Sequence, residues 1–218
     1  MDQITTIIFD FDGTLADTAT VIVDTMRRTF ADMGLQVPAE EDMRRTIGMK
    51  LLLALAELGH LSDSQAIDAT ERYKKFFKEY AVDQVRLFPE VAETLHKLQE
   101  AGIRCAIATS RNAESLMTIL ANNDITHCFG TIVSNSDNLA PKPEPDMVLA
   151  ILERMGAGAG ETLVVGDTTF DILMGKRAGC RCCAVTWGNH DRETLASAAP
   201  DCYIDNFSEL LSLPYLKP

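Results

Sequence analysis

The chain has 218 residues, of which 46% are hydrophobic and 24% are charged, and its formal net charge is −12. A chain of this length and apolar content can bury a substantial core, as one large domain or as two smaller ones. The negative charge argues against nonspecific binding to nucleic acid or to anionic lipid surfaces, so we expect neither kind of partner.

We predict the cellular compartment from the signals that the sequence does not show. Met1-Asp2-Gln3 has neither the basic start nor the long apolar core of a secretory signal, and no apolar run approaches the roughly 20 residues of a membrane span. The six cysteines are too few and too scattered to form a disulfide framework for a chain of this size. We therefore expect a reduced cytoplasmic protein without a membrane partner, as a monomer or a homodimer.

The chain begins with an apolar run that predicts a buried strand at residues 4–9, and this strand ends in two carboxylates, Asp10 and Asp12, followed by Gly13. Carboxylates at the end of a buried strand repel each other and lose solvation, so a cation must compensate them. Mg²⁺ binds one or two carboxylates together with water and phosphate oxygens. The alternative is an ordinary polar turn, which Asp and Gly also favour.

Residues 17–82 are predicted to be entirely helical. Apolar residues recur at steps of three and four over residues 17–35, and further helical segments follow at 40–46, 51–58 and 64–80. The last of these has an apolar stripe formed by Ile67, Tyr73, Phe76, Phe77 and Tyr80, and we expect its aromatic residues Tyr73, Phe76 and Phe77 to belong to the core of this helical unit. Because no strand pattern interrupts this segment, it reads as a helical insertion after the first strand.

From residue 83 onward strands and helices alternate. The predicted strands are 103–108, 130–133, 162–165 and 181–186, with a possible short one at 202–204, and the predicted helices are 90–101, 114–122, 146–155 and 170–178. This alternation is typical of an α/β fold, a Rossmann-like parallel sheet with helices on both faces. We assign residues 1–16 and 83–218 to this core domain and residues 17–82 to the inserted helical domain.

Polar residues follow several of the predicted strands, where ligands bind in parallel sheets. Besides Asp10 and Asp12, these residues are Thr109, Ser110, Lys142, Asp167 and Asp171. Carboxylates can hold a hard cation, while a hydroxyl, backbone amides and an ammonium can hold a phosphoryl group.

The same residues resemble the four motifs of the haloacid dehalogenase-like phosphohydrolase superfamily. Asp10-Phe-Asp12-Gly-Thr-Leu-Ala-Asp17 is similar to the first motif, Thr109 to the second, Lys142 to the third, and Gly166-Asp167 with Asp171 to the fourth. The helical insertion resembles the family's four-helix type of cap. The nearest branch is the phosphoglycolate phosphatase-like one, which Thr186-Trp187-Gly188 also resembles.

The resemblance implies that Asp10 is a nucleophile that forms an aspartyl-phosphate. It implies that Asp12 is the general acid toward the leaving alcohol and then the general base toward water.

The resemblance also implies a Mg²⁺ ion held by Asp10, the backbone carbonyl of Asp12 and Asp167, with Asp171 as a direct or water-mediated ligand. The alternative for Asp171 is a plain helix start, where a carboxylate complements the helix dipole.

By the same resemblance, the Thr109 hydroxyl, the Ser110 amide and Lys142 would hold the transferring phosphoryl oxygens. Lys142, between two prolines, could instead be an ordinary loop lysine. Arg111 fits substrate binding and a solvated helix start equally well.

In the resembling family the cap selects the leaving group, which here indicates residues 44–50 as the specificity segment. Its candidate residues are Arg45, Gly48 and Lys50. The cations of this segment hint at an anionic leaving group, although a solvated helix end has the same composition.

The predicted function is a Mg²⁺-dependent phosphatase that acts on small phosphorylated metabolites such as phosphoglycolate. The alternatives are a pyrophosphatase, a phosphomutase similar to beta-phosphoglucomutase, and a phosphate-binding regulatory module without turnover. Met49-Lys50 stands where the mutases carry a Ser-Arg pair, which weakens the mutase interpretation.

Overall fold

The computed structural model describes residues 3–216. Within them, the main sheet has six parallel strands in the order β5-β4-β1-β6-β7-β8. The strands are β1 (Thr6–Phe9), β4 (Arg104–Ala108), β5 (Phe129–Val133), β6 (Thr162–Gly166), β7 (Arg181–Val185) and β8 (Cys202–Ile204). The predicted parallel α/β sheet is therefore confirmed, including its short last strand.

β1 lies in the middle of this sheet, where the strand order reverses. The chain first builds β4 and β5 on one side of β1 and then crosses to the other side for β6, β7 and β8. The crevice at such a reversal, at the carboxyl ends of the strands, is where open α/β sheets bind ligands.

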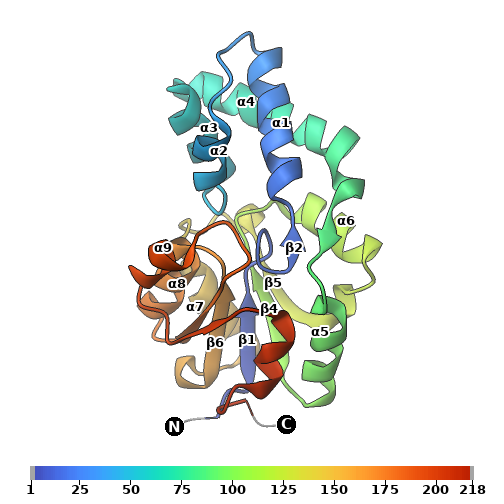
Figure 1. Ribbon diagram of the computed structural model, residues 1–218, viewed down its shortest axis with the longest axis vertical. Coiled ribbons are helices and arrows are strands. Elements are labelled where there is room, and N and C mark those ends of the chain that lie inside the picture. Colours follow the sequence, from blue (N-terminus) through green and yellow to red (C-terminus); the bar gives the residue numbers. More distant parts are fainter. Residues whose placement is uncertain (1–2, 217–218) are drawn as a thin grey trace.

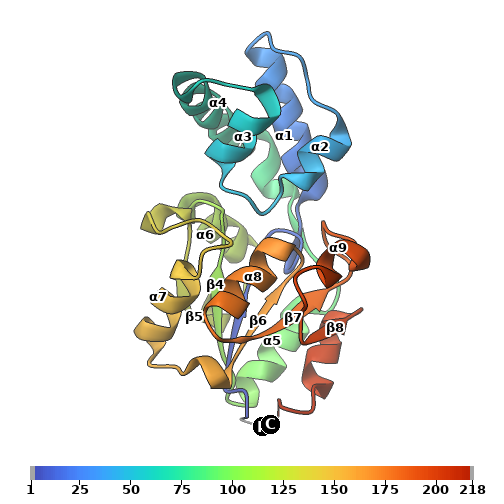
Figure 2. The same cartoon turned by 90° about the vertical axis from the view of Figure 1, so that its left-hand side faces the viewer.

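Helices cover both faces of the sheet (Figures 1 and 2). Ile7 and Phe9 of β1 belong to a core shared with α5 (Val91–Glu100), α6 (Ala113–Asn122) and the C-terminal 3₁₀ turn Phe207–Ser212. Ile8 faces the opposite core, formed with α7 (Asp146–Met155), α8 (Thr169–Arg177) and α9 (Arg192–Ala196). Successive side chains of a strand point to opposite faces of the sheet. In β1 both sets are apolar, so each face packs against helices.

The inserted segment forms a bundle of helices that lies beyond the carboxyl ends of the strands (Figure 1). These helices, which we call the cap, are α1 (Ala19–Asp32), α2 (Glu40–Arg45), α3 (Leu51–Gly59) and α4 (Asp63–Phe76), and a π-helical turn, Phe77–Ala81, follows α4. The helical cap is thus confirmed.

Two short strands lie where the chain enters and leaves the cap. β2 (Ala16–Asp17) pairs antiparallel with β3 (Arg86–Leu87), so that Asp17 faces Arg86. The prediction that the first cap helix begins at residue 17 was therefore wrong by two residues, because the backbone of Asp17 is taken up by this pairing.

The predicted apolar stripe of the last cap helix is only partly correct. Tyr73 and Phe77 are buried, but Ile67 is 55% exposed and Tyr80 is 52% exposed. The π-helical turn that starts at Phe77 changes the helical period, so Tyr80 no longer follows the 3.6-residue pattern. Ile67 precedes this turn, and its position about 120° around α4 from Tyr73 takes it off the buried face. Among residues 3–216, no helix combines the length and the apolar character that crossing a membrane requires.

Candidate active site

Three carboxylates converge beside β1 at the carboxyl edge of the sheet. Asp10 directly follows β1, Asp167 directly follows β6, and Asp171 lies in the first turn of α8. One oxygen atom of each carboxylate lies within 4.8 Å of one oxygen of each of the other two, and all three side chains are buried. β1 and β6 are neighbours in the sheet, so residues far apart in the sequence meet here, as the sequence predicts.

Lys142 is the cation of this cluster. Its Nζ donates to Asp10 Oδ1 and, over 2.7 Å, to Asp171 Oδ1, and its side chain is 1% exposed. Burial by itself would lower the pKa of Lys142, but the charges of Asp10 and Asp171 reverse this and hold the pKa above its ordinary value. Lys142 is therefore a charged part of the site, and the structure excludes the alternative of an exposed loop lysine.

Asp10 has one oxygen without a partner. Lys142 contacts Oδ1, whereas the buried Oδ2 accepts no hydrogen bond from the part of the chain that the structure describes. Burial raises the pKa of Asp10 well above its usual value; Lys142 opposes this effect, and Asp171 and Asp167 add to it. An unpartnered carboxylate oxygen beside like charges is costly, so the site calls for a further ligand at this atom.

Asp167 is held in place by residues from two turns. Its Oδ1 accepts a hydrogen bond from the Thr14 hydroxyl over 3.0 Å, and its Oδ2 accepts from the amide and side-chain nitrogens of Asn189 over 2.8 and 2.7 Å. Burial, followed by the charge of Asp171, raises the pKa of Asp167 to about 7. The Asn189 side chain also reaches the backbone carbonyl of Asp12 over 3.4 Å, which places that carbonyl beside Asp167.

Two glycines leave room for Asp167. A Cβ at Gly13, whose φ is +91°, would lie 2.2 Å from Asp167 Oδ2, and a Cβ at Gly188 would lie 2.1 Å from Asp167 Cβ. Only glycine fits at either position without displacing the carboxylate.

Asp171 has the helix-start role that the sequence left open, and it also lies in the carboxylate cluster. Its Oδ2 accepts hydrogen bonds from the Thr168 amide over 3.0 Å and the Thr168 hydroxyl over 2.7 Å, which closes a capping box at the start of α8. Its Oδ1 faces Lys142 and lies within the carboxylate cluster. Asp171 thus joins the helix start to the charged site.

The cluster fits a hard divalent cation. It offers carboxylate oxygens only, one of them unpartnered among the described residues, and the Lys142 ammonium pairs with Asp10 and Asp171 but not with Asp167. Oxygen-only donor sets of this kind suit Mg²⁺, Mn²⁺ or Ca²⁺ rather than softer metals.

Asp12 lies apart from the cluster and pairs with Arg111. The guanidinium donates from Nε to both Asp12 oxygens, over 3.2 and 3.0 Å, and a second nitrogen also reaches Oδ1. Arg111 lies over the Phe77 ring at 4.5 Å from its centre, so a cap residue helps to seat it. Arg111 is therefore a buried part of the site, and it fixes the direction of the Asp12 carboxylate.

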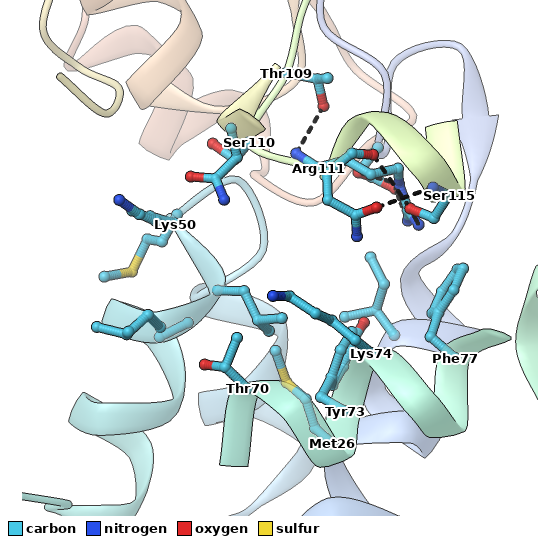
Figure 3. Close-up of a pocket in the computed structure, with 18 of the residues that line it drawn as sticks. Met26, Lys50, Thr70, Tyr73, Lys74, Phe77, Thr109, Ser110, Arg111 and Ser115 are labelled. Atoms are coloured by element: carbon cyan, nitrogen blue, oxygen red, sulfur yellow. Dashed lines mark hydrogen bonds and ion pairs between the residues drawn. The ribbon is translucent and has the colours of Figure 1, made fainter. Parts of the chain in front are cut away.

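A cavity of about 770 Å³ opens above these residues, between the sheet edge and the cap (Figure 3). Asp10, Asp12, Thr109 and Ser110 form its floor. Thr109 is 1% exposed, its amide donates to the Val133 carbonyl, and its hydroxyl accepts from the Arg111 amide over 3.2 Å.

The specificity candidates of residues 44–50 divide into two groups. Gly48 and Lys50 line the cavity, and the Gly48 carbonyl accepts a 2.7 Å hydrogen bond from the Ser110 hydroxyl. The structure does not bring Arg45 there: its side chain is 66% exposed and pairs with Asp42 on α2.

The model of one protein family, described as haloacid dehalogenase-like hydrolase, matches residues 7–185. The chain belongs to this family. The matched range, residues 7–185, includes the four motifs named in the sequence analysis and the whole cap. Asn189, which was not predicted from the sequence, lies just beyond this range. The neighbouring Thr186-Trp187-Gly188, which resembles the phosphoglycolate phosphatase-like branch, was the signal that could have pointed to it.

This hydrolase is similar over its length to curated proteins with several names. It is 35% identical to the probable phosphatase IndB of Dickeya dadantii, over 94% of this chain and 91% of that protein. It is 31% identical to a phosphoglycolate phosphatase of Photorhabdus laumondii, over 97% and 94% of the two chains. It is 30% identical to the pyrophosphatase PpaX of Bacillus velezensis, over 99% and 98%.

The fold of the hydrolase also matches solved structures. A haloacid dehalogenase-like hydrolase from Bacteroides fragilis superposes with a TM-score of 0.91 at 28% identity, covering 95% of this chain and all of the other.

Proposed function

We propose that this hydrolase is a Mg²⁺-dependent phosphatase that acts on phosphate monoesters of small metabolites through an aspartyl-phosphate on Asp10. The observation that carries the proposal is the Asp10 carboxylate, with Oδ1 on Lys142 and Oδ2 unpartnered among the described residues, at the floor of the cavity. A buried, oriented carboxylate is suited to covalent catalysis. Relatives named phosphatase support the same reaction class.

In the first step, a carboxylate oxygen of Asp10 attacks the phosphorus atom, and the bond between phosphorus and the alcohol oxygen breaks. Asp12 must enter this step protonated, with its ion pair to Arg111 loosened, and it donates that proton to the departing alcohol. The Thr109 hydroxyl, the Ser110 amide and the Lys142 ammonium hold the phosphoryl oxygens while negative charge moves between them.

In the second step, a water molecule attacks the same phosphorus atom, and the bond to Asp10 breaks to release inorganic phosphate. Asp12 accepts the proton of this water. Arg111 holds the ionised Asp12 carboxylate in place at the floor of the cavity before it accepts this proton.

Asp10 and Asp167 would hold the Mg²⁺ ion, with Asp171 beside them. When bound, Mg²⁺ supplies positive charge that offsets the carboxylates and the phosphoryl group. Asn189 and Thr14 keep Asp167 turned toward Asp10.

A pyrophosphatase is the second candidate, because a relative similar over nearly its whole length carries that name. The same two steps would then expel phosphate instead of an alcohol. Rates of phosphate release from pyrophosphate and from monoesters separate the two candidates, and a mutase would release little phosphate from either.

The test is the Asp10→Asn variant with p-nitrophenyl phosphate and Mg²⁺. We expect phosphate release to fall by roughly 1,000-fold or more, because the nucleophile is lost. Wild-type chain quenched in acid during turnover should carry a phosphoryl group that hydroxylamine removes.

Asp24→Asn is the matched control, since the Asp24 side chain is 56% exposed on α1. It should keep wild-type activity. Wild-type turnover by folded Asp10→Asn protein would contradict the assignment of the nucleophile.

A further inference from the structure

The walls of the cavity differ in chemistry from its floor. The floor carries the charged and hydroxyl groups described above, whereas the walls that rise into the cap are mostly apolar. Apolar wall residues come from three cap helices or their flanking turns and include Met26, Ile47, Leu51, Leu52, Tyr73 and Phe77. In Figure 3, Met26, Tyr73 and Phe77 lie across the cavity from Thr109, Ser110 and Arg111.

Charged groups of the cap lie where the cavity meets solvent. Lys74 and Lys78 line it but are 42% and 74% exposed, and each pairs over 2.7 Å with a glutamate that also lines it, Glu71 or Glu114. Lys74 and Lys78 therefore already have anionic partners. Lys50 and Lys75 line the cavity as well, but most of the cap residues around them are apolar.

The cavity exists although the cap touches the core on two sides. On one side the Ser110 hydroxyl contacts the Gly48 carbonyl over 2.7 Å. On the other side Lys78, in the turn after α4, pairs with Glu114 of α6. The cavity is the space that remains between cap and core beside these two contacts.

This volume far exceeds a phosphoglycolate molecule. Phosphoglycolate has nine non-hydrogen atoms, which fill about 270 Å³ even at the roughly 30 Å³ that each water molecule occupies in the liquid. The cavity measures about 770 Å³.

We infer that the leaving group is a bulky, largely apolar alcohol, whose body occupies the cap cavity while the phosphate rests on Asp10. This inference rests on the proposed phosphatase function and narrows its substrate class. An apolar body gains free energy from every methylene it buries against these walls, whereas glycolate has almost none to bury.

The test compares ethyl phosphate, 2-phenylethyl phosphate and phosphoglycolate with Mg²⁺. Ethyl and 2-phenylethyl phosphate both release a primary alcohol, so they differ mainly in the phenyl group that the cavity would hold. We expect kcat/KM for 2-phenylethyl phosphate to exceed both other values at least tenfold.

Two neighbouring leucines of α3 provide a matched pair of variants. Leu52 lines the cavity, whereas Leu53 is 44% exposed and does not contribute to the lining formed by the described residues. Leu52→Trp should lower the ratio of kcat/KM for 2-phenylethyl over ethyl phosphate at least tenfold, because the indole fills the space. Leu53→Trp should leave that ratio unchanged.

The outcomes separate this inference from the proposed function. Phosphate release from no monoester would overturn the phosphatase proposal and the inference with it. Two other outcomes would overturn the inference alone. One is a higher kcat/KM for phosphoglycolate or ethyl phosphate than for 2-phenylethyl phosphate. The other is a Leu52→Trp enzyme whose ratio of kcat/KM for 2-phenylethyl over ethyl phosphate equals that of the wild type.

Discussion

Lys142 is the single residue on which the charge balance of the site depends most. It faces Asp10 and Asp171, with Asp167 in the same cluster. Two buried carboxylates therefore share one ammonium. Without that ammonium, the site would hold several buried charges of one sign, a costly arrangement in a medium of low polarity.

Replacing Lys142 by Gln should therefore be strongly destabilising. We expect a loss of about 3–5 kcal/mol in the free energy of unfolding without divalent cations, as for other broken buried pairs. Urea denaturation followed by circular dichroism measures this loss. Added Mg²⁺ should recover part of it, because the cation offsets the same carboxylates.

The matched control is Lys176→Gln, since Lys176 pairs with Asp201 where both side chains are well exposed, at 34% and 40%. This variant should cost less than about 1 kcal/mol. Equal losses in the two variants would mean that Lys142 is not a charge-balancing residue.

At the scale of elements, the turn between α2 and α3 joins the cap to the catalytic floor. Gly48 in this turn has φ +98°, and a Cβ there would lie 3.2 Å from Thr168 Cγ2. Thr168 caps α8 and holds Asp171, so the turn rests directly on a residue of the site. A small displacement of the turn would reach both the Ser110 contact and the start of α8.

Gly48→Ala should impair catalysis more than it impairs stability. The variant has a strained backbone, which costs about 1 kcal/mol, and a methyl group pressed against Thr168. We expect kcat/KM for a phosphate monoester to fall about tenfold or more because the cap turn can no longer sit on the floor, and steady-state kinetics measures the fall.

Gly34→Ala separates backbone strain from this contact. Gly34 lies in the cap with φ +68°, but a Cβ there would meet nothing within 4 Å. It should lose similar stability and keep its kcat/KM. If both variants lose activity equally, strain in the cap rather than the contact with Thr168 explains the effect.

At the scale of the whole molecule, the sequence predicted the sheet, the cap and the meeting of Asp10 with Asp167, because buried strands and amphipathic helices have clear periods. It did not predict β2 and β3, since two-residue strands are too short to show alternation. Asn189 was missed for another reason: it lies in an irregular turn after β7, and only tertiary contacts bring it to Asp167. Likewise, periodicity could not tell that Arg45 faces solvent whereas Gly48 faces the core.

The carboxylate cluster connects distant parts of the chain, so the binding of a cation there should stabilise the whole fold. A ligand at 100 times its Kd adds about 2.7 kcal/mol to the free energy of unfolding, which corresponds to a rise in Tm of roughly 5–10 °C for a chain of this size. We expect Mg²⁺ to raise Tm by such an amount in a thermal-shift measurement, and EDTA to reverse the rise. Asp167→Asn should abolish the shift, whereas Asp205→Asn, whose side chain is 66% exposed, should keep it.

The rise in Tm that Mg²⁺ causes should also depend on pH, because Mg²⁺ binds the ionised form of Asp167. Because burial raises the pKa of Asp167 to about 7, protons compete with Mg²⁺ for this carboxylate below that pH. The metal-free chain should lose stability as the pH rises from the ordinary range of an aspartate toward 7, since the ionised form is unfavourable in the fold. Mg²⁺ binds this ionised form, so the rise in Tm should be larger at pH 8 than at pH 6. A shift of equal size at both values would show that Asp167 does not take part in binding the cation.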